Sequence, residues 1–157
     1  MILKHSPIGA EGGHAAGRNL LKTMYEAQYS KTMPPILTTP LGKPYFEGEN
    51  VYFSISHTPN HVFCVLSERP VGIDAEEADR EIRLALAEKI LSPTELPRYD
   101  AWENKQEALL RLWVLKEAQL KCLGTGLQGY PNHTDFSPDD PRITMINGCF
   151  VAVIEKE

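Results

Sequence analysis

Apolar and polar side chains alternate along several short segments of the chain, and this alternation predicts β-strands. Segments 51–56 and 61–67 show it, and so does Val71–Glu77, so we expect these three to form an antiparallel meander. Near the end of the chain, apolar segments 143–146 and 149–154 flank an Asn-Gly pair, which is typical of a two-residue hairpin turn. The pattern therefore predicts strands in the middle of the chain and a hairpin at its end.

Apolar residues at helical spacing predict α-helices before and between these strands. The spacing indicates helices over 14–29, 78–91 and 103–123, the last being the longest. Ser-Pro-Thr-Glu at 92–95 has the residues of a capping box and predicts the start of a short further helix. Segment 31–44 holds four prolines and predicts an extended connector. This mixture favours an α+β fold in which helices pack against antiparallel sheet.

Length, charge and cysteine content narrow the class of protein. A chain of 157 residues fits one domain that can bury a substantial core. The net charge of -5 argues against a nucleic-acid partner held by bulk charge. The three cysteines lack metal-binding spacing and lie among apolar residues, which indicates buried thiols in a reducing compartment. With no leader-like start and no long apolar run, we expect a cytoplasmic protein without a membrane span.

The predicted strand Val71–Glu77 carries two acidic side chains that face the same way. Asp74 and Glu76 are two residues apart, which places them on one face of the strand together with Gly72. We expect Gly72 to leave that face open, and paired carboxylates beside a gap suit a hard divalent cation such as Mg²⁺. An acidic face on a half-exposed strand explains the same pattern without a ligand, and this strand alone favours that simpler explanation.

The longest predicted helix places ionisable residues among apolar ones. Trp113, Glu117, Leu120 and Lys121 fall on one side of a helix with about 3.6 residues per turn. An acid and a lysine in such a stripe must be paired, bind a metal or face a cleft. An ion pair between Glu117 and Lys121, four residues apart, is the alternative that needs no ligand.

For three other basic side chains, the sequence is consistent either with binding a ligand or with an ordinary structural role. Lys43 lies between a glycine and a proline, so it is a fixed phosphate ligand or an ordinary turn residue. His57 follows a predicted strand and is a polar turn residue or a donor to an anion. Arg18 lies on a basic helix face, which contact with solvent would explain.

Five motifs occur in order along the chain. They are Gly17-Arg18, Gly42-Lys-Pro44, Ser54-Ile-Ser-His57, Val71-Gly-Ile-Asp-Ala-Glu76 and Trp113-Val-Leu-Lys-Glu-Ala-Gln-Leu-Lys121. Together they resemble the motifs of the 4′-phosphopantetheinyl transferase superfamily, in a short form of the branch typified by the surfactin synthetase activator. The resemblance covers roughly residues 12–127.

This resemblance implies an activity and a metal site. Members of the family transfer the phosphopantetheine arm of coenzyme A, their co-substrate, to a serine of an acyl or peptidyl carrier protein. They release adenosine 3′,5′-bisphosphate and need Mg²⁺. By position, Asp74, Glu76 and Glu117 correspond to the metal ligands, and Glu117 also corresponds to the base, acting directly or through water. Lys121 corresponds to a catalytic residue that faces the pyrophosphate.

The remaining candidates correspond to coenzyme A contacts in the family. By position, His57 corresponds to a residue that faces the pyrophosphate as well, whereas Lys43 and Ser56 correspond to residues that contact the nucleotide or its phosphates. His14 and Arg18 correspond to the region near the adenosine end. The chain is shorter on its N-terminal side than most of this branch, where basic residues help to bind the 3′-phosphate, and this difference bears on the affinity for coenzyme A more than on the chemistry.

The resemblance also implies a 4′-phosphopantetheinyl transferase-like fold. It predicts one domain of two pseudo-equivalent halves, about 1–70 and 71–157, each with antiparallel strands packed on a helix. We expect a monomer with no nucleic-acid or membrane partner. Two other functions fit the same residues: a Mg²⁺-dependent phosphohydrolase, with water as the nucleophile, and a coenzyme A-binding relative that does not transfer.

Overall fold

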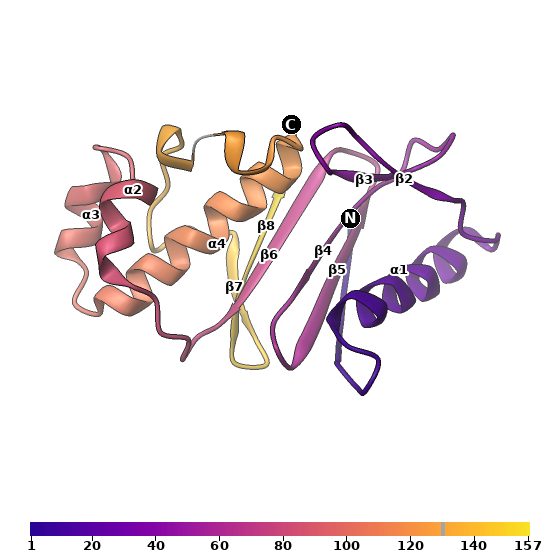
Figure 1. The fold of residues 1–157 in the computed structure, drawn as a ribbon, viewed down its shortest axis with the longest axis horizontal. Coiled ribbons are helices and arrows are strands. Elements are labelled where there is room, and N and C mark those ends of the chain that lie inside the picture. The colour runs from indigo at the N-terminus through magenta and orange to yellow at the C-terminus, as the bar shows by residue number, and fades with distance from the viewer. Residues whose placement is uncertain (130) are drawn as a thin grey trace.

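The structure is a computed structural model that describes residues 1–129 and 131–157. Two three-stranded antiparallel sheets form its centre (Figure 1). The first sheet contains, in spatial order, β1 (Ile2–Pro7), β5 (His61–Ser67) and β4 (Tyr52–His57). The second contains β6 (Val71–Glu77), β8 (Cys149–Glu155) and β7 (Ile143–Ile146). A separate hairpin consists of β2 (Ile36–Thr38) and β3 (Pro44–Phe46).

One long helix covers the outer face of each sheet (Figure 1). Helix α1 (Gly13–Tyr29) packs on the first sheet and α4 (Lys105–Leu123) on the second. The shorter helical segments are η1 (Leu84–Leu86), α2 (Ala87–Ile90), α3 (Glu95–Ala101), η2 (Gly126–Gly129) and η3 (Pro131–His133). This arrangement confirms the predicted α+β fold with antiparallel strands packed on helices.

The alternation of side chains along the strands divides the apolar interior into layers. On β5, Cys64 and Leu66 pack toward α1, whereas Phe63 and Val65 pack between the two sheets. Strand β6 contributes its apolar side chains to the same central layer. The opposite face of β6, which carries Asp74, is therefore turned toward α4.

The two sheets meet where β4 and β6 lie side by side. Serine hydroxyls connect them there, because Oγ of Ser54 accepts from the amide of Ile73 and Oγ of Ser56 accepts from the amide of Ala75, both at 3.1 Å. The predicted meander is wrong in one respect, since β6 pairs with β8 and not with β5. That pairing places both strands under α4, and the local pattern carries no information on so distant a partner.

Two local predictions are confirmed in atomic detail. Ser92 and Glu95 form the expected capping box, with the amide of Ser92 donating to Oε2 of Glu95 at 2.9 Å and the amide of Glu95 donating to Oγ of Ser92 at 3.2 Å. Asn147 and Gly148 have φ angles of 48° and 74°, as a two-residue hairpin turn requires.

Other local predictions were wrong in part. The extended connector 31–44 contains β2 and the start of β3, which pair with each other. The helix predicted over 78–91 is limited to η1 and α2, because the side-chain amide of Gln106 binds both the main-chain nitrogen and oxygen of Ile82 at 2.8 Å. The pattern gave no prediction for β1. Among the helices of the described residues, none combines the length and the apolar character needed to span a bilayer.

Candidate active site

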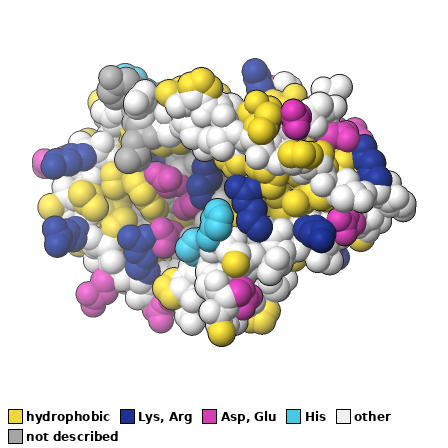
Figure 2. Space-filling model, turned by 45° about the vertical axis from the view of Figure 1, so that its right-hand side comes forward, with side chains coloured by type: hydrophobic (Ala, Val, Ile, Leu, Met, Phe, Trp, Pro, Cys, Tyr) yellow, Lys and Arg dark blue, Asp and Glu magenta, His cyan; other side chains and the backbone are white. Residues whose placement is uncertain are grey.

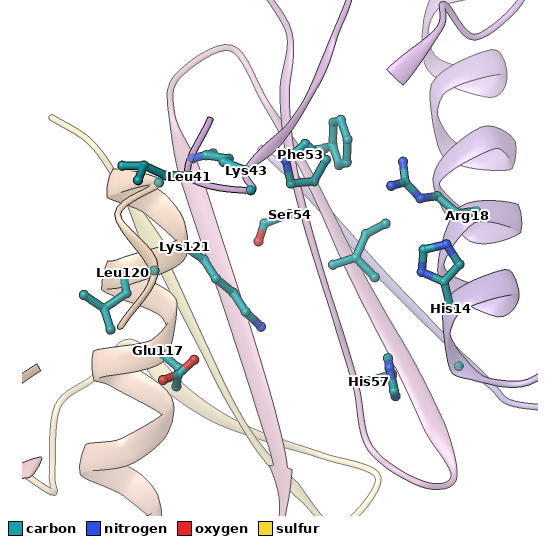
Figure 3. A pocket seen from close by; sticks show the side chains of 16 residues that line it. His14, Arg18, Leu41, Lys43, Phe53, Ser54, His57, Glu117, Leu120 and Lys121 are labelled. Atoms are coloured by element: carbon teal, nitrogen blue, oxygen red, sulfur yellow. The ribbon is translucent and has the colours of Figure 1, made fainter. Parts of the chain in front are cut away.

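A cleft of about 390 Å³ lies between the two halves of the chain (Figure 3). Helix α1 and strand β4 form one wall, α4 forms the other, and the loop between β2 and β3 lies at one end. On the face shown in Figure 2, basic, acidic and histidine side chains gather around a central hollow. The predicted site residues that line the cleft are His14, Arg18, Lys43, His57, Glu117 and Lys121.

Helix α4 is fixed at both ends, which sets the position of its cleft residues. At its start, the side chain of Asn104 accepts from the amide of Glu107 at 3.1 Å. At its end, Gly124 adopts a φ of 75° and donates its amide to the carbonyl of Leu120. Glu117 and Lys121 are one turn apart on this helix and both line the cleft.

Gly72 serves a different purpose from the one predicted. We expected it to leave one face of β6 open, but the backbone of α4 fills that space. A Cβ atom at Gly72 would lie 2.0 Å from the carbonyl oxygen of Ala118 and 2.4 Å from the amide nitrogen of Cys122. The glycine thus lets α4 pack directly on β6, and this close approach brings Lys121 to Asp74.

Asp74 is buried, with a side chain only 9% exposed, behind the cleft wall. Its Oδ1 accepts from Nζ of Lys121 at 2.7 Å and from Oγ of Ser56 at 3.1 Å. Its Oδ2 is buried and has no hydrogen-bond partner among the described residues. Burial raises the pKa of Asp74, and the ammonium of Lys121 opposes this effect.

Glu117 is the second carboxylate of the site. Its Oε1 is also buried without a hydrogen-bond partner in the part of the chain that the structure describes. Burial, followed by the nearby charge of Asp74, raises the pKa of Glu117, while Lys121 lowers it. Lys121 forms its ion pair with Asp74, so the pairing with Glu117 that we kept as an alternative is not the one observed.

The donor set around these carboxylates fits a hard cation in part. Buried carboxylate oxygens without partners are costly, and Oδ2 of Asp74 and Oε1 of Glu117 are of the type that Mg²⁺ prefers. Glu76 instead forms an ion pair with Arg80, four residues further along the chain and beyond the end of β6. Within residues 1–129 and 131–157, no group of three or more His, Cys, Asp or Glu side chains is arranged to hold a metal. The structure thus brings together Asp74 and Glu117, and it places Glu76 near enough for its charge to raise the pKa of Glu117, although Glu76 is paired with Arg80.

Lys43 and Ser56 have partners within the protein. Nζ of Lys43 donates to the carbonyl oxygen of Cys122 at 2.7 Å, and burial lowers the pKa of this lysine. Lys43 therefore ties the β2–β3 loop to the end of α4 while it lines the cleft. Ser56 is buried and does not line the cleft, since its hydroxyl lies between Asp74 and the amide of Ala75.

The opposite wall holds the remaining candidates. His14 and Arg18 lie one turn apart on α1 and point toward the cleft, as His57 does from the end of β4 (Figure 3). A Cβ atom at Gly13 would lie 2.5 Å from Nδ1 of His57, so the first turn of α1 packs directly against the imidazole ring. Two segments far apart in the sequence, α1 and the end of β4, thus supply basic groups to this wall of the cleft.

Apart from Leu120, which was placed on the same helix side as Glu117 and Lys121, the apolar part of the cleft was not predicted. Leu41, Phe53, Ile55 and Leu120 line it beside the charged residues. On a strand or a helix such residues indicate a core, so their type alone does not reveal a cleft. Leu41 offered one signal, because it stands between a proline and a glycine in a segment without apolar periodicity and its side chain is exposed.

Comparisons with a family model and with individual proteins point to the same family. A model of the 4′-phosphopantetheinyl transferase superfamily matches residues 70–149, which is just over half of the chain. The matched segment contains β6 and α4, and with them Asp74, Glu117 and Lys121.

Individual relatives match over a larger share of this chain than of their own. The 4′-phosphopantetheinyl transferase gsp of Aneurinibacillus migulanus is 33% identical over 55% of this chain and 36% of its own length. A 4′-phosphopantetheinyl transferase of Bacillus subtilis is 33% identical over 55% and 39%. The 4′-phosphopantetheinyl transferase psf-1 of Bacillus pumilus is 30% identical over 82% and 58%. The chain thus spans only part of the length of the relatives that it matches.

Proposed function

We propose that this chain, which belongs to the 4′-phosphopantetheinyl transferase superfamily, transfers the phosphopantetheine arm of coenzyme A to a serine of an acyl or peptidyl carrier protein. The relatives that it matches carry the name of that activity. The observation that carries the proposal is the pair Asp74 and Glu117, whose buried oxygens lack partners next to the cleft lysine Lys121.

The reaction requires a neutral serine hydroxyl to attack the pyrophosphate of coenzyme A. A bond forms between the serine oxygen and the phosphorus that bears the arm, and the bond from that phosphorus to the bridging oxygen breaks. Adenosine 3′,5′-bisphosphate leaves with the electron pair. Glu117 accepts the hydroxyl proton, directly or through water, because it lines the cleft beside Lys121.

Asp74 and Glu117 would hold the magnesium ion, and Glu76 would join them after leaving Arg80. When bound, Mg²⁺ supplies charge neutralisation on the phosphates. Lys121 adds a compact positive charge on the same side of the cleft, and His57 faces it from β4 (Figure 3). Positioning and electrostatic stabilisation carry most of the barrier in reactions of this kind.

The remaining cleft residues would bind the nucleotide part of coenzyme A. Nζ of Lys43 has three donors and uses two of them on the carbonyls of Cys122 and Val71, so the third can reach a phosphate without leaving α4. His14 and Arg18 would contact the adenosine end from α1. For Ser56 we propose an indirect role, because its hydroxyl already holds Asp74.

One copy of the chain supplies both walls of this cleft, which supports a monomer as part of the same proposal. Three buried free thiols, Cys64, Cys122 and Cys149, support a reducing compartment such as the cytoplasm.

The test is to incubate the protein with coenzyme A, Mg²⁺ and a panel of apo carrier proteins, and to weigh the carriers by mass spectrometry. We expect at least one carrier to gain the mass of the arm, and to gain none when Mg²⁺ is omitted. Coenzyme A cleaved without any carrier would replace the proposal with a phosphohydrolase. Binding of coenzyme A with no carrier modified would replace it with a non-catalytic binding protein.

A further inference from the structure

Lys121 occupies a central position between the two carboxylates of the site. Its Nζ lies 2.7 Å from Oδ1 of Asp74 and 3.0 Å from the carbonyl oxygen of Ile73. The side chain is 33% exposed and extends into the cleft beside Glu117 (Figure 3). The ammonium therefore donates two hydrogen bonds to β6 and is still accessible from the cleft.

This contact neutralises a charge that would otherwise be unpaired. Asp74 is almost fully buried, and a buried ionised carboxylate without a counter-ion is unstable. Ser56 adds only a neutral hydrogen bond to the same oxygen, Oδ1. Among the described residues, Lys121 is the ion-pair partner of Asp74, so it serves as the local counter-ion in the absence of any ligand.

We infer that Lys121 is a tethered stand-in for the divalent cation: in the free protein it neutralises Asp74 through Oδ1, and a cation bound to the unpaired Oδ2 of Asp74 and Oε1 of Glu117 takes over that role. This inference rests on the proposed function, which places a divalent cation on Asp74 and Glu117. A pyrophosphate in the cleft offers the ammonium a new anionic partner. The lysine then changes from neutralising Asp74 to neutralising the phosphates.

The exchange makes the binding of metal and of coenzyme A interdependent. Without coenzyme A, a cation at Oδ2 must share the charge of Asp74 with the ammonium of Lys121, which stays on Oδ1 at 2.7 Å and repels the cation. With coenzyme A present, Lys121 has an alternative partner, so the cost of releasing Asp74 falls. Because coupling between two ligands is reciprocal, the metal should strengthen the binding of coenzyme A by the same factor.

The experiment titrates Mn²⁺, a spectroscopic substitute for Mg²⁺, into the wild type and into Lys121→Met without coenzyme A or carrier. We expect Lys121→Met to bind Mn²⁺ about tenfold more tightly, which is within the range usual for coupled sites. The matched control is Lys43→Met, which removes a lysine from the same cleft whose Nζ contacts main-chain carbonyls and no carboxylate. Its Mn²⁺ affinity should change by a much smaller factor.

A second titration adds coenzyme A. It should strengthen Mn²⁺ binding in the wild type by a larger factor than in Lys121→Met. An unchanged or weaker Mn²⁺ affinity in folded Lys121→Met, or an equal effect of coenzyme A in both proteins, would overturn the inference. Lys121→Gln takes the place of the methionine variant if a melting curve shows the latter to be unfolded. Failure of the proposed function would appear separately, as no modified carrier in the mass spectrum, because the first titration contains neither coenzyme A nor carrier.

Discussion

Helix α4 carries two lysines that meet a carboxylate of another element at the same distance, in very different surroundings. Nζ of Lys116 lies 2.7 Å from Oε2 of Glu95, and both side chains are fully buried. Nζ of Lys121 lies 2.7 Å from Oδ1 of Asp74, but Lys121 is one-third exposed and lines the cleft. The distance alone therefore does not separate a structural ion pair from one in a binding site.

The buried pair is distinguished by a full set of partners. Lys116 also donates to main-chain carbonyls of segment 131–134, and Glu95 accepts from the amides of Ser92 and Phe136. Burial lowers the pKa of Lys116, and Glu95 opposes this. The pair thus joins α3, α4 and the segment after η2 in a closed network. The cleft pair leaves acceptors on Asp74 and Glu117 unused, which is what a site for a cation needs.

The largest effect is expected from the two carboxylates at the cleft, whose loss should stop the transfer reaction. We predict that Asp74→Ala and Glu117→Ala each abolish transfer to a carrier, because they come from different elements and would hold the cation between them. Glu76→Ala should cost less, since Glu76 bonds Arg80 and a water can replace it in a site that keeps waters. Carrier mass spectra at ordinary Mg²⁺ concentration measure this, and turnover of Asp74→Ala at the wild-type rate would rule out the assigned site.

Substitutions in the closed network of Lys116 and Glu95 should lower the free energy of unfolding. Lys116→Met leaves Glu95 buried without a counter-ion, and we expect the free energy of unfolding to fall by about 3–5 kcal/mol. Lys116→Met combined with Glu95→Gln removes the charge and keeps an acceptor for one of the two amides, so it should recover part of that loss. Urea denaturation of the three proteins measures both values. A loss below about 1 kcal/mol in the single variant would show that the pair does not hold the fold together.

Variants of the cleft pair of Lys121 and Asp74 should change the rate of transfer more than the stability. We expect Lys121→Ala to lower turnover by about 10²–10³, or some 2.7–4 kcal/mol, because the ammonium faces charge that develops on the leaving phosphate. Lys121→Arg should recover only part of the rate, since a planar fork does not replace a compact ammonium. The melting temperature should fall less than in Lys116→Met. A rate loss below about threefold in folded protein would place Lys121 with ordinary surface ion pairs.

The sequence predicts these two networks unequally, for a physical reason. Local periodicity is enough to place Asp74 on a strand and Glu117 and Lys121 on one side of a helix. It does not identify partners, because the pairing of β6 with β8 and the packing of Gly72 on α4 are contacts between distant segments. The partner of Lys116 shows this most clearly. Glu95 was predicted only as a capping residue, and its second role depends on how α3 packs on α4.

The smallest expected effect is the difference between alanine variants of two serines on β4 that accept the same type of hydrogen bond. Ser54 and Ser56 each accept from an amide of β6 at 3.1 Å. Replacing either by alanine leaves a buried amide unpaired, so both variants should lose a similar free energy of unfolding, about 1–3 kcal/mol.

Only Ser56 also donates to Oδ1 of Asp74, and this difference should appear in the rate. We expect Ser56→Ala to lower kcat about tenfold more than Ser54→Ala, because Asp74 loses the hydroxyl that orients it opposite Lys121. The measurement is kcat and KM for coenzyme A in both variants, with urea denaturation as the control for stability. If Ser56→Ala instead raised KM for coenzyme A at an unchanged kcat, Ser56 would be a direct contact to the nucleotide. Its position between Asp74 and Ala75 would then change when coenzyme A binds.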